Sequence, residues 1–89
     1  MNKYSILIPT YNEKENIGIL IKKISYFLRK NIFEIIVIDD NSNDGTKEIL
    51  VDLRKKNKKL NYFVRQNYDR DLSKSIIFGL KKTNYENII

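Results

Sequence analysis

The chain has 89 residues, of which 42% are hydrophobic, so its composition is that of one small globular domain and not of a disordered segment. No apolar run approaches the ~20 residues that a membrane span needs, and without cysteine the sequence offers neither a disulfide framework nor a thiolate metal site. The net charge of +6 is concentrated in residues 46–89, which hold eleven basic and five acidic residues, against six of each in residues 1–45.

The first elements are a strand and a helix. Residues 4–9 read as a short buried strand that Pro9 ends. Asn12 and Glu15 have the spacing of a capping box, which predicts that a helix starts there and runs to about Asn31. Its inward positions, spaced as on one helix face, are Ile17, Leu20, Ile21, Ile24, Phe27 and Leu28.

The second strand and helix follow. Residues 34–39 are continuous in Ile and Val, as expected of a strand covered on both faces. A turn over residues 41–45 leads to a helix over about 46–56. The basic run at residues 54–59 then complements the helix dipole. The inward positions of this helix are Ile49, Leu50 and Leu53.

The last third continues the alternation. Residues 60–64 predict a third, weaker strand, residues 73–82 a third helix, and residues 87–89 the start of a fourth strand. The inward positions of that helix are Ile76, Ile77 and Leu80. The fold class is therefore α/β, a parallel sheet with flanking helices, with the first three strands in the order 3-2-1.

Two adjacent carboxylates, Asp39 and Asp40, end the second strand. Ligands of such sheets bind outside the carboxyl ends of the strands, so this segment and the one after the first strand should be neighbours. Asp39 is nearer the sheet and suits a structural role. Asp40 is expected to project into the loop, where it could accept N–H donors from a base. Capping and turn formation explain the segment equally: Gly45 suits positive φ, and Ser42, Asn43 or Asp44 could cap the next helix.

Tyr11 is the aromatic residue at this end of the sheet. Its ring offers a flat face on which a nucleobase could stack, an interaction worth roughly 1–3 kcal/mol. A tyrosine packed on the first helix is the equally weighted alternative.

Residues 4–17, "YSILIPTYNEKENI", and 34–46, "EIIVIDDNSNDGT", resemble the opening of family-2 inverting glycosyltransferases. The branch of dolichyl- or polyprenyl-phosphate mannosyl- and glucosyltransferases is the most similar, and residues 70–89, "RDLSKSIIFGLKKTNYENII", resemble its third block. The resemblance implies the start of a nucleotide-diphospho-sugar transferase fold of the GT-A type, which is Rossmann-like. It also implies donor-binding roles for six residues: Pro9, Tyr11, Glu13, Asp39, Asp40 and Arg70.

Those roles differ. Pro9, Tyr11 and Glu13 would line the nucleotide pocket, Asp40 would hydrogen-bond the base, and Asp39 would support the loop. Arg70 would lie near the donor phosphates, which match a guanidinium. Asp71 stands where the family usually has glycine, so Arg70 and Asp71 could instead pair with each other.

The family's Asp-x-Asp segment, which holds Mg²⁺ or Mn²⁺ against the donor diphosphate, follows its fourth strand. This sequence stops at Ile89 as that strand begins, without ligands for the metal, so residues 1–89 are expected to be an incomplete N-terminal nucleotide-binding part that is inactive alone. The resemblance implies a GDP- or UDP-sugar donor and, in the full-length relatives, a polyprenyl or dolichyl phosphate acceptor.

Two other classes of protein share some of these features. A receiver-like regulatory domain has paired acidic residues, but they follow its first strand, and residues 60–64 run into "RQN" without the aspartate that a receiver phosphorylates. A basic nucleic-acid-binding module could use the tyrosines for stacking. Most basic residues fit helix faces and ends, however, and a compositional bias toward Lys, Asn and Ile also explains the charge, so no nucleic-acid partner is expected.

The expected location is the cytoplasm. Residues 1–13, "MNKYSILIPTYNE", have only a short apolar stretch that meets Pro9, unlike a signal peptide. Association with the cytoplasmic face of a membrane is the alternative location.

Overall fold

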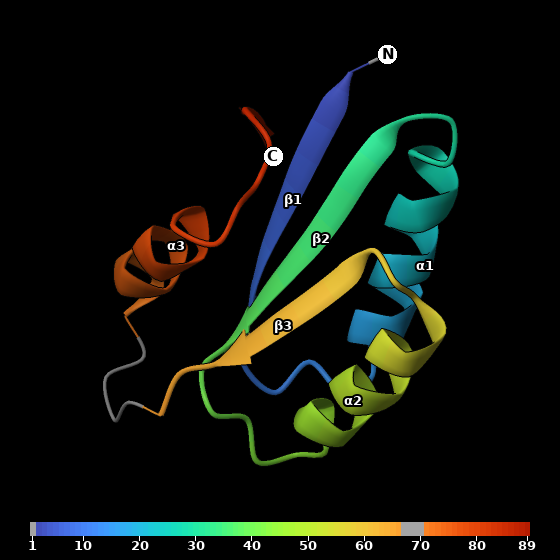
Figure 1. The fold of residues 1–89 in the computed structure, drawn as a ribbon. Coiled ribbons are helices and arrows are strands. Elements are labelled where there is room, and N and C mark those ends of the chain that lie inside the picture. The colour runs from blue at the N-terminus through green and yellow to red at the C-terminus, as the bar shows by residue number, and fades with distance from the viewer. Residues whose placement is uncertain (1, 67–70) are drawn as a thin grey trace.

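A computed structural model describes residues 2–66 and 71–89 and shows one sheet with helices on both faces (Figure 1). Helices α1 and α2 cover one face, and α3 covers the other. None of the helices within the described ranges is long and apolar enough to cross a membrane. The elements in chain order are β1 (Lys3–Thr10), α1 (Ile17–Phe27), β2 (Ile32–Asp39), α2 (Thr46–Lys56), β3 (Leu60–Val64), α3 (Leu72–Leu80) and β4 (Asn87–Ile88).

The sheet has the order β3-β2-β1-β4, and all its pairs are parallel, which confirms the predicted order. Thr10 of β1 lies opposite Asp39 of β2, and Asp39 lies opposite Val64 of β3. The carboxyl ends of these three strands therefore end level with one another, so residues that follow them meet at one edge.

The main core lies between the sheet and the α1–α2 layer. Strand β2 is at its centre and is buried on both faces, with residues 35–38 at most 1% exposed. The predicted inward residues of α2 pack there, but two of those predicted for α1 do not, since Leu20 is 42% and Phe27 82% exposed. The buried cluster comprises Ile6, Ile17, Ile21, Leu28, Phe33, Ile35, Val37, Leu50 and Leu60.

The predicted capping box at Asn12 is wrong. Helix α1 begins at Ile17, and Asn12 has a left-handed backbone with φ of 53°. The Asn12 side chain instead accepts a hydrogen bond from the backbone N–H of Asn43, at 3.0 Å. The segment after β1 is therefore used to join the loop after β2, and the helix starts one turn later than predicted.

Helix α3 packs on the sheet through small residues. Its buried positions are Ser75 and Gly79, whereas Ile77, predicted to face inward, is 54% exposed. A Cβ on Gly79 would lie 2.2 Å from Cδ1 of Leu7, so only glycine allows this approach without displacement. Ile76 and Leu80 are exposed as well. Helical spacing thus predicted the wrong face of α3: the face that packs on the sheet carries the small residues Ser75 and Gly79.

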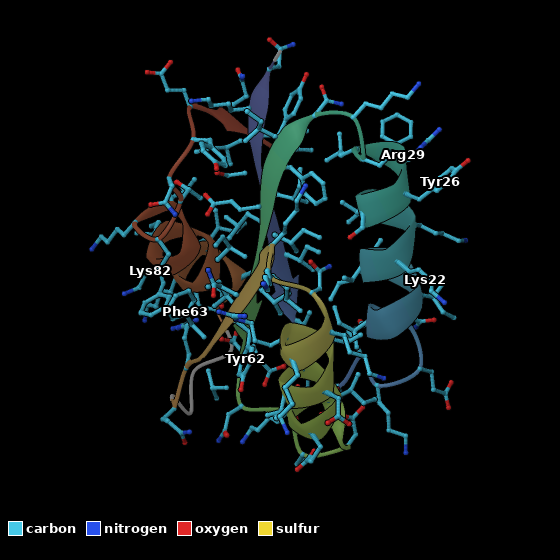
Figure 2. All side chains as sticks on the ribbon, turned by 45° about the vertical axis from the view of Figure 1, so that its right-hand side comes forward. Lys22, Tyr26, Arg29, Tyr62, Phe63 and Lys82 are labelled. Carbon is cyan, nitrogen blue, oxygen red and sulfur yellow. The ribbon has the colours of Figure 1, made fainter. Side chains whose placement is uncertain are left out.

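An aromatic pair flanks this contact. Phe63 of β3 and Phe78 of α3 meet edge to face with their ring centroids 6.1 Å apart. The ammonium of Lys82 lies 5.0 Å from the Phe63 centroid, and Figure 2 shows these two side chains close together beside α3. These contacts fix α3 against the outer strand of the sheet.

A buried carboxylate ties the chain together at the amino end of the sheet. Glu34 accepts hydrogen bonds from the Ser5 hydroxyl at 2.6 Å and from the backbone and side-chain N–H groups of Asn84 at 2.6 and 2.8 Å. Burial alone raises the pKa of Glu34, but the hydrogen bonds from Ser5 and Asn84 prevail and lower it below its ordinary value. The segment that leads into β4 is thereby fastened to β1 and β2.

Candidate functional site

The loops that follow β1 and β2 lie side by side at the carboxyl edge of the sheet, the lower edge in Figure 1. The backbone N–H of Asn12 donates to the Ser42 hydroxyl at 2.9 Å, and that of Glu13 donates to the Thr46 hydroxyl at 3.0 Å. Asp44 also accepts from the backbone of Lys14 at 3.3 Å. The predicted proximity of these two segments is confirmed.

Asp39 lies beneath both loops and is fully buried. Its carboxylate accepts hydrogen bonds from the Thr10 hydroxyl at 2.8 Å and from the Ser42 backbone and hydroxyl at 2.8 and 2.5 Å. One carboxylate thus joins the last residue of β1 to the turn after β2. This geometry suits the role of loop support that the sequence suggested for Asp39.

Asp40 does not project into the loop as expected. It is 9% exposed, and its carboxylate forms an ion pair with Arg65 at 3.0 Å. The Ser75 hydroxyl lies 2.9 and 2.8 Å from the two carboxylate oxygens. A charge so close to the sheet is stable only when it is paired, and the pairing turns the side chain toward β3 and α3.

The Arg65 side chain comes directly from the end of β3. Its backbone N–H donates to the Asp39 carbonyl at 2.8 Å, which continues the β2–β3 pairing by one residue. The parallel sheet thereby brings the guanidinium beside the carboxylate that follows β2. The basic partner of Asp40 is adjacent in the sheet although it lies 25 residues away in sequence.

A cavity of about 270 Å³ opens beside Asp40. It is lined by Pro9, Thr10, Tyr11, Asp40 and Leu72. Three residues that the resemblance assigned to a nucleotide pocket therefore share one cavity wall. The volume falls just below the ~300 Å³ at the lower end of ordinary ligand pockets, so the cavity suits part of a ligand, such as one planar ring.

Glu13 lies elsewhere. It lines a second cavity of about 200 Å³ between the end of β1 and the start of α1, and it does not line the cavity of Tyr11 and Asp40. Its carboxylate accepts from the Asn16 side chain at 3.4 Å. Pro9 borders both cavities, so the structure divides the predicted set into two neighbouring groups around this proline.

Arg70 lies outside the described residues, and so does the suggested pairing of Arg70 with Asp71. Asp71 itself caps α3, because its side chain accepts from the backbone N–H groups of Ser73 at 2.8 Å and Lys74 at 3.4 Å. The carboxylate found where the family usually has glycine thus serves the start of a helix.

The turn after β2 is joined to the start of α2 by Asp44, which accepts from the Thr46 backbone and hydroxyl at 3.0 and 2.5 Å. The N-cap of α2 is nevertheless Gly45, without a side-chain cap hydrogen bond, so the prediction that Ser42, Asn43 or Asp44 is the N-cap is wrong. The hydrogen bond from the Thr46 hydroxyl lowers the pKa of Asp44. Gly45 has φ of 107°, which confirms the positive φ expected there.

Sequence reasoning missed Arg65 and Ser75, which both contact the Asp40 carboxylate. The signal for Arg65 was its position directly after a strand adjacent to β2, since parallel strands bring their carboxyl ends together. Ser75 left a weaker signal, because a small polar residue four positions before a glycine is common in exposed helices too. Among the residues that the structure describes, no group of three or more His, Cys, Asp or Glu side chains could hold a metal ion.

The chemistry of the site is that of binding. Asp40, whose carboxylate is paired with Arg65, and the aromatic residue Tyr11 both line one small cavity. A flat ligand that donates an N–H matches these two features.

The sequence is similar to a known protein family and to characterised relatives. Residues 5–89 match the family described as glycosyl transferase family 2. The GalNAc(5)-diNAcBac-PP-undecaprenol beta-1,3-glucosyltransferase of Campylobacter jejuni is 41% identical over 68 residues, which are 76% of this chain and 22% of that protein. The dolichol-phosphate mannosyltransferase of Pyrococcus furiosus is 37% identical over 82 residues, which are 92% of this chain and 23% of that protein.

A solved structure supports the fold. The mannosyltransferase PcManGT from Pyrobaculum calidifontis, in complex with GDP-Man and Mn²⁺, superposes with a TM-score of 0.76 at 22% identity. The match covers 91% of this chain and 24% of that one. The fold is therefore the expected GT-A type, and the chain spans about a quarter of the length of this protein and of the two relatives.

Proposed function

We propose that this chain, which belongs to glycosyl transferase family 2, supplies the nucleotide-binding part of an enzyme that transfers a sugar from a nucleotide-sugar donor to a lipid phosphate. The observation that carries the proposal is the cavity at the carboxyl edge of the sheet, where Pro9, Tyr11 and Asp40 meet. This is where ligands of parallel α/β sheets bind. Tyr11 and Asp40 have side chains that can interact with a nucleotide base.

The proposed roles of the six residues are as follows. The ring of Tyr11 stacks on the base, and Asp40 accepts an N–H from the base edge. Asp39 holds the two loops in register through Thr10 and Ser42. Pro9 and Glu13 line the nucleotide pocket, Glu13 from the adjoining cavity, and Arg70 lies near the donor phosphates, as the family resemblance implies.

The donor and acceptor come from the relatives. A GDP- or UDP-sugar is the proposed donor, since the similar solved structure is a mannosyltransferase with GDP-Man. A polyprenyl or dolichyl phosphate is the proposed acceptor, as the names of the relatives suggest. The proposed location is the cytoplasm, where a lipid phosphate acceptor would be met at the cytoplasmic face of a membrane. Fractionation of cells tests it: recovery of the protein outside the cytoplasm and away from that membrane face would contradict it.

The proposed reaction uses a divalent metal, whose ligands we expect outside the residues that the structure describes. The described part of the chain has no cluster of ligands that fits Mg²⁺ or Mn²⁺. We therefore expect the 89-residue chain to bind a nucleotide and to transfer no sugar. Sugar transfer from any nucleotide donor by the purified chain would contradict the expectation that these residues only bind the nucleotide.

Calorimetric titration of the chain with GDP and with UDP tests the proposal. At least one of them should bind, and Tyr11→Ala should weaken that binding by about 1–3 kcal/mol because the stacking platform is lost. The matched control is Tyr26→Ala, an exposed tyrosine at the far end of α1 that is 67% exposed and contacts Arg29 (Figure 2). Failure of both nucleotides to bind, or equal losses in the two variants, would reject the assignment.

A further inference from the structure

Three elements converge on one carboxylate. Asp40 follows β2, Arg65 follows β3, and Ser75 lies on the buried face of α3. Arg65 donates from one terminal nitrogen to Asp40 at 3.0 Å and to the Ser75 hydroxyl oxygen at 2.5 Å. Arg65 and Ser75 are buried, whereas the Asp40 side chain stays 11% exposed and Asp40 lines the cavity at the sheet edge.

The network fixes the carboxylate in two ways. Arg65 supplies the compensating charge, so Asp40 stays an ionised acceptor without needing a cation from a ligand. Ser75 lies within hydrogen-bond distance of both carboxylate oxygens, which restricts rotation of the group. Gly79, one turn further along α3, permits the close approach that brings Ser75 there.

We infer that Arg65 and Ser75 are positioning residues that set base specificity, so that the site takes nucleotides whose base has a ring N–H. The inference rests on the proposed function. Guanine and uracil have such a donor, whereas adenine and cytosine have a lone pair on the corresponding ring nitrogen and carry their N–H donors on the exocyclic amino group beside it.

The selectivity arises because a carboxylate in this setting can only accept. An ionised aspartate has no proton to donate. A ring N–H facing it forms a charge-assisted hydrogen bond, while a ring lone pair facing it is repelled by the negative charge. A site built to accept a donor from its ligand rejects an analogue that lacks it far more strongly than an apolar pocket rejects a change of shape.

The experiment measures four affinities on the full 89-residue chain. GDP, UDP, ADP and CDP are titrated by calorimetry, and the tighter of GDP and UDP is compared with the tighter of ADP and CDP. The wild-type ratio should be tenfold or more. Ser75→Ala should reduce that ratio at least threefold, and Arg65→Gln should bring it close to one. Arg65→Lys, which keeps the charge, should restore part of it.

Two controls separate positioning from general damage. Ser73→Ala makes the same change on the exposed face of α3, and Arg54→Gln removes an exposed guanidinium of α2 that donates to Asn61. Both should keep the wild-type ratio. Ser75→Ala retains a strong helix former, so it remains informative if Arg65→Gln does not fold.

The outcomes distinguish this inference from the proposed function. Absence of binding by all four nucleotides overturns both. Binding of GDP or UDP with an unchanged ratio in Ser75→Ala and Arg65→Gln overturns the inference alone, and so does a wild-type ratio near one. A ratio that falls in these two variants and persists in the controls supports it.

Discussion

Both ends of the sheet bury carboxylates, and two of them, Glu34 and Asp40, are satisfied differently. At the amino end, Glu34 accepts from neutral donors on Ser5 and Asn84. At the carboxyl end, Asp40 is paired with the guanidinium of Arg65 and also borders a cavity. Neutral donors suffice where the carboxylate fastens a segment of the chain, whereas a full counter-charge is present where the carboxylate faces a candidate ligand site. Burial of an acidic residue therefore does not by itself mark a functional position.

The largest expected effect comes from removing the counter-charge. Arg65→Met leaves Asp40 buried without a cation, so the free energy of unfolding should fall by about 3–5 kcal/mol. Urea unfolding followed by circular dichroism measures it. Adding Asp40→Asn to this variant should recover part of the loss, because the unpaired charge is then gone. A double variant no more stable than Arg65→Met would contradict the pairing.

Next in size is the effect of Asp40 on binding. Asp40→Asn should weaken the binding of the preferred nucleotide by about 1.5–3 kcal/mol, the value of a hydrogen bond to a charged group. Asp52→Asn, an exposed carboxylate on α2, serves as the control in the same calorimetric titration. Unchanged affinity for every nucleotide in Asp40→Asn would show that the cavity at the carboxyl end is not the base site.

Two helical glycines allow the packing of helices on the two faces of the sheet to be compared. Gly79→Ala places a methyl group against Leu7 and Ile38, so we expect a loss of about 1–3 kcal/mol of stability. Gly18→Ala in α1 meets no atom within 4 Å and should raise stability by about 0.5–1 kcal/mol. Thermal unfolding of both variants checks the contrast. Equal shifts of Tm would mean that α3 does not pack as closely as described.

The smallest effect is the pH dependence at the amino end. The pKa of Glu34 is lower in the folded chain than its ordinary value of 4.5, so its contribution to stability is complete above pH 4.5. This contribution is lost as the pH falls from there through the folded pKa. Glu34→Gln should therefore flatten the decline of stability on acidification, and exposed Glu15→Gln should not. Parallel profiles for wild type and Glu34→Gln would contradict the network.

Periodicity and topology rules were enough to predict the sheet. The three main strands, their parallel order and α2 agree with the sequence analysis, because continuous Ile and Val segments alternate with helical spacing. The inward face of α3 was predicted wrongly. Apolar spacing favours Ile76 and Ile77, whereas the distance between helix and sheet is set by Gly79, whose contribution is the absence of a side chain.

The candidate site was predicted in part. Tyr11, Pro9 and Asp40 were identified from short motifs and lie around one cavity. The orientation of Asp40 was not predictable from its neighbours in sequence, because its partner Arg65 comes from the adjacent strand and Ser75 from the opposite layer. Partners across a sheet become predictable only once the strand order is known.

Mapping of the binding surface by heteronuclear NMR tests the central claim most directly. On addition of GDP or UDP to the labelled chain, the amide signals of Tyr11, Asp40 and Leu72 should shift with a common dissociation constant. Those of Glu34, Asn84 and Tyr85 at the amino end should stay in place. Shifts confined to the amino end, or none at either end at millimolar nucleotide, would contradict the assignment of the carboxyl edge as the nucleotide site.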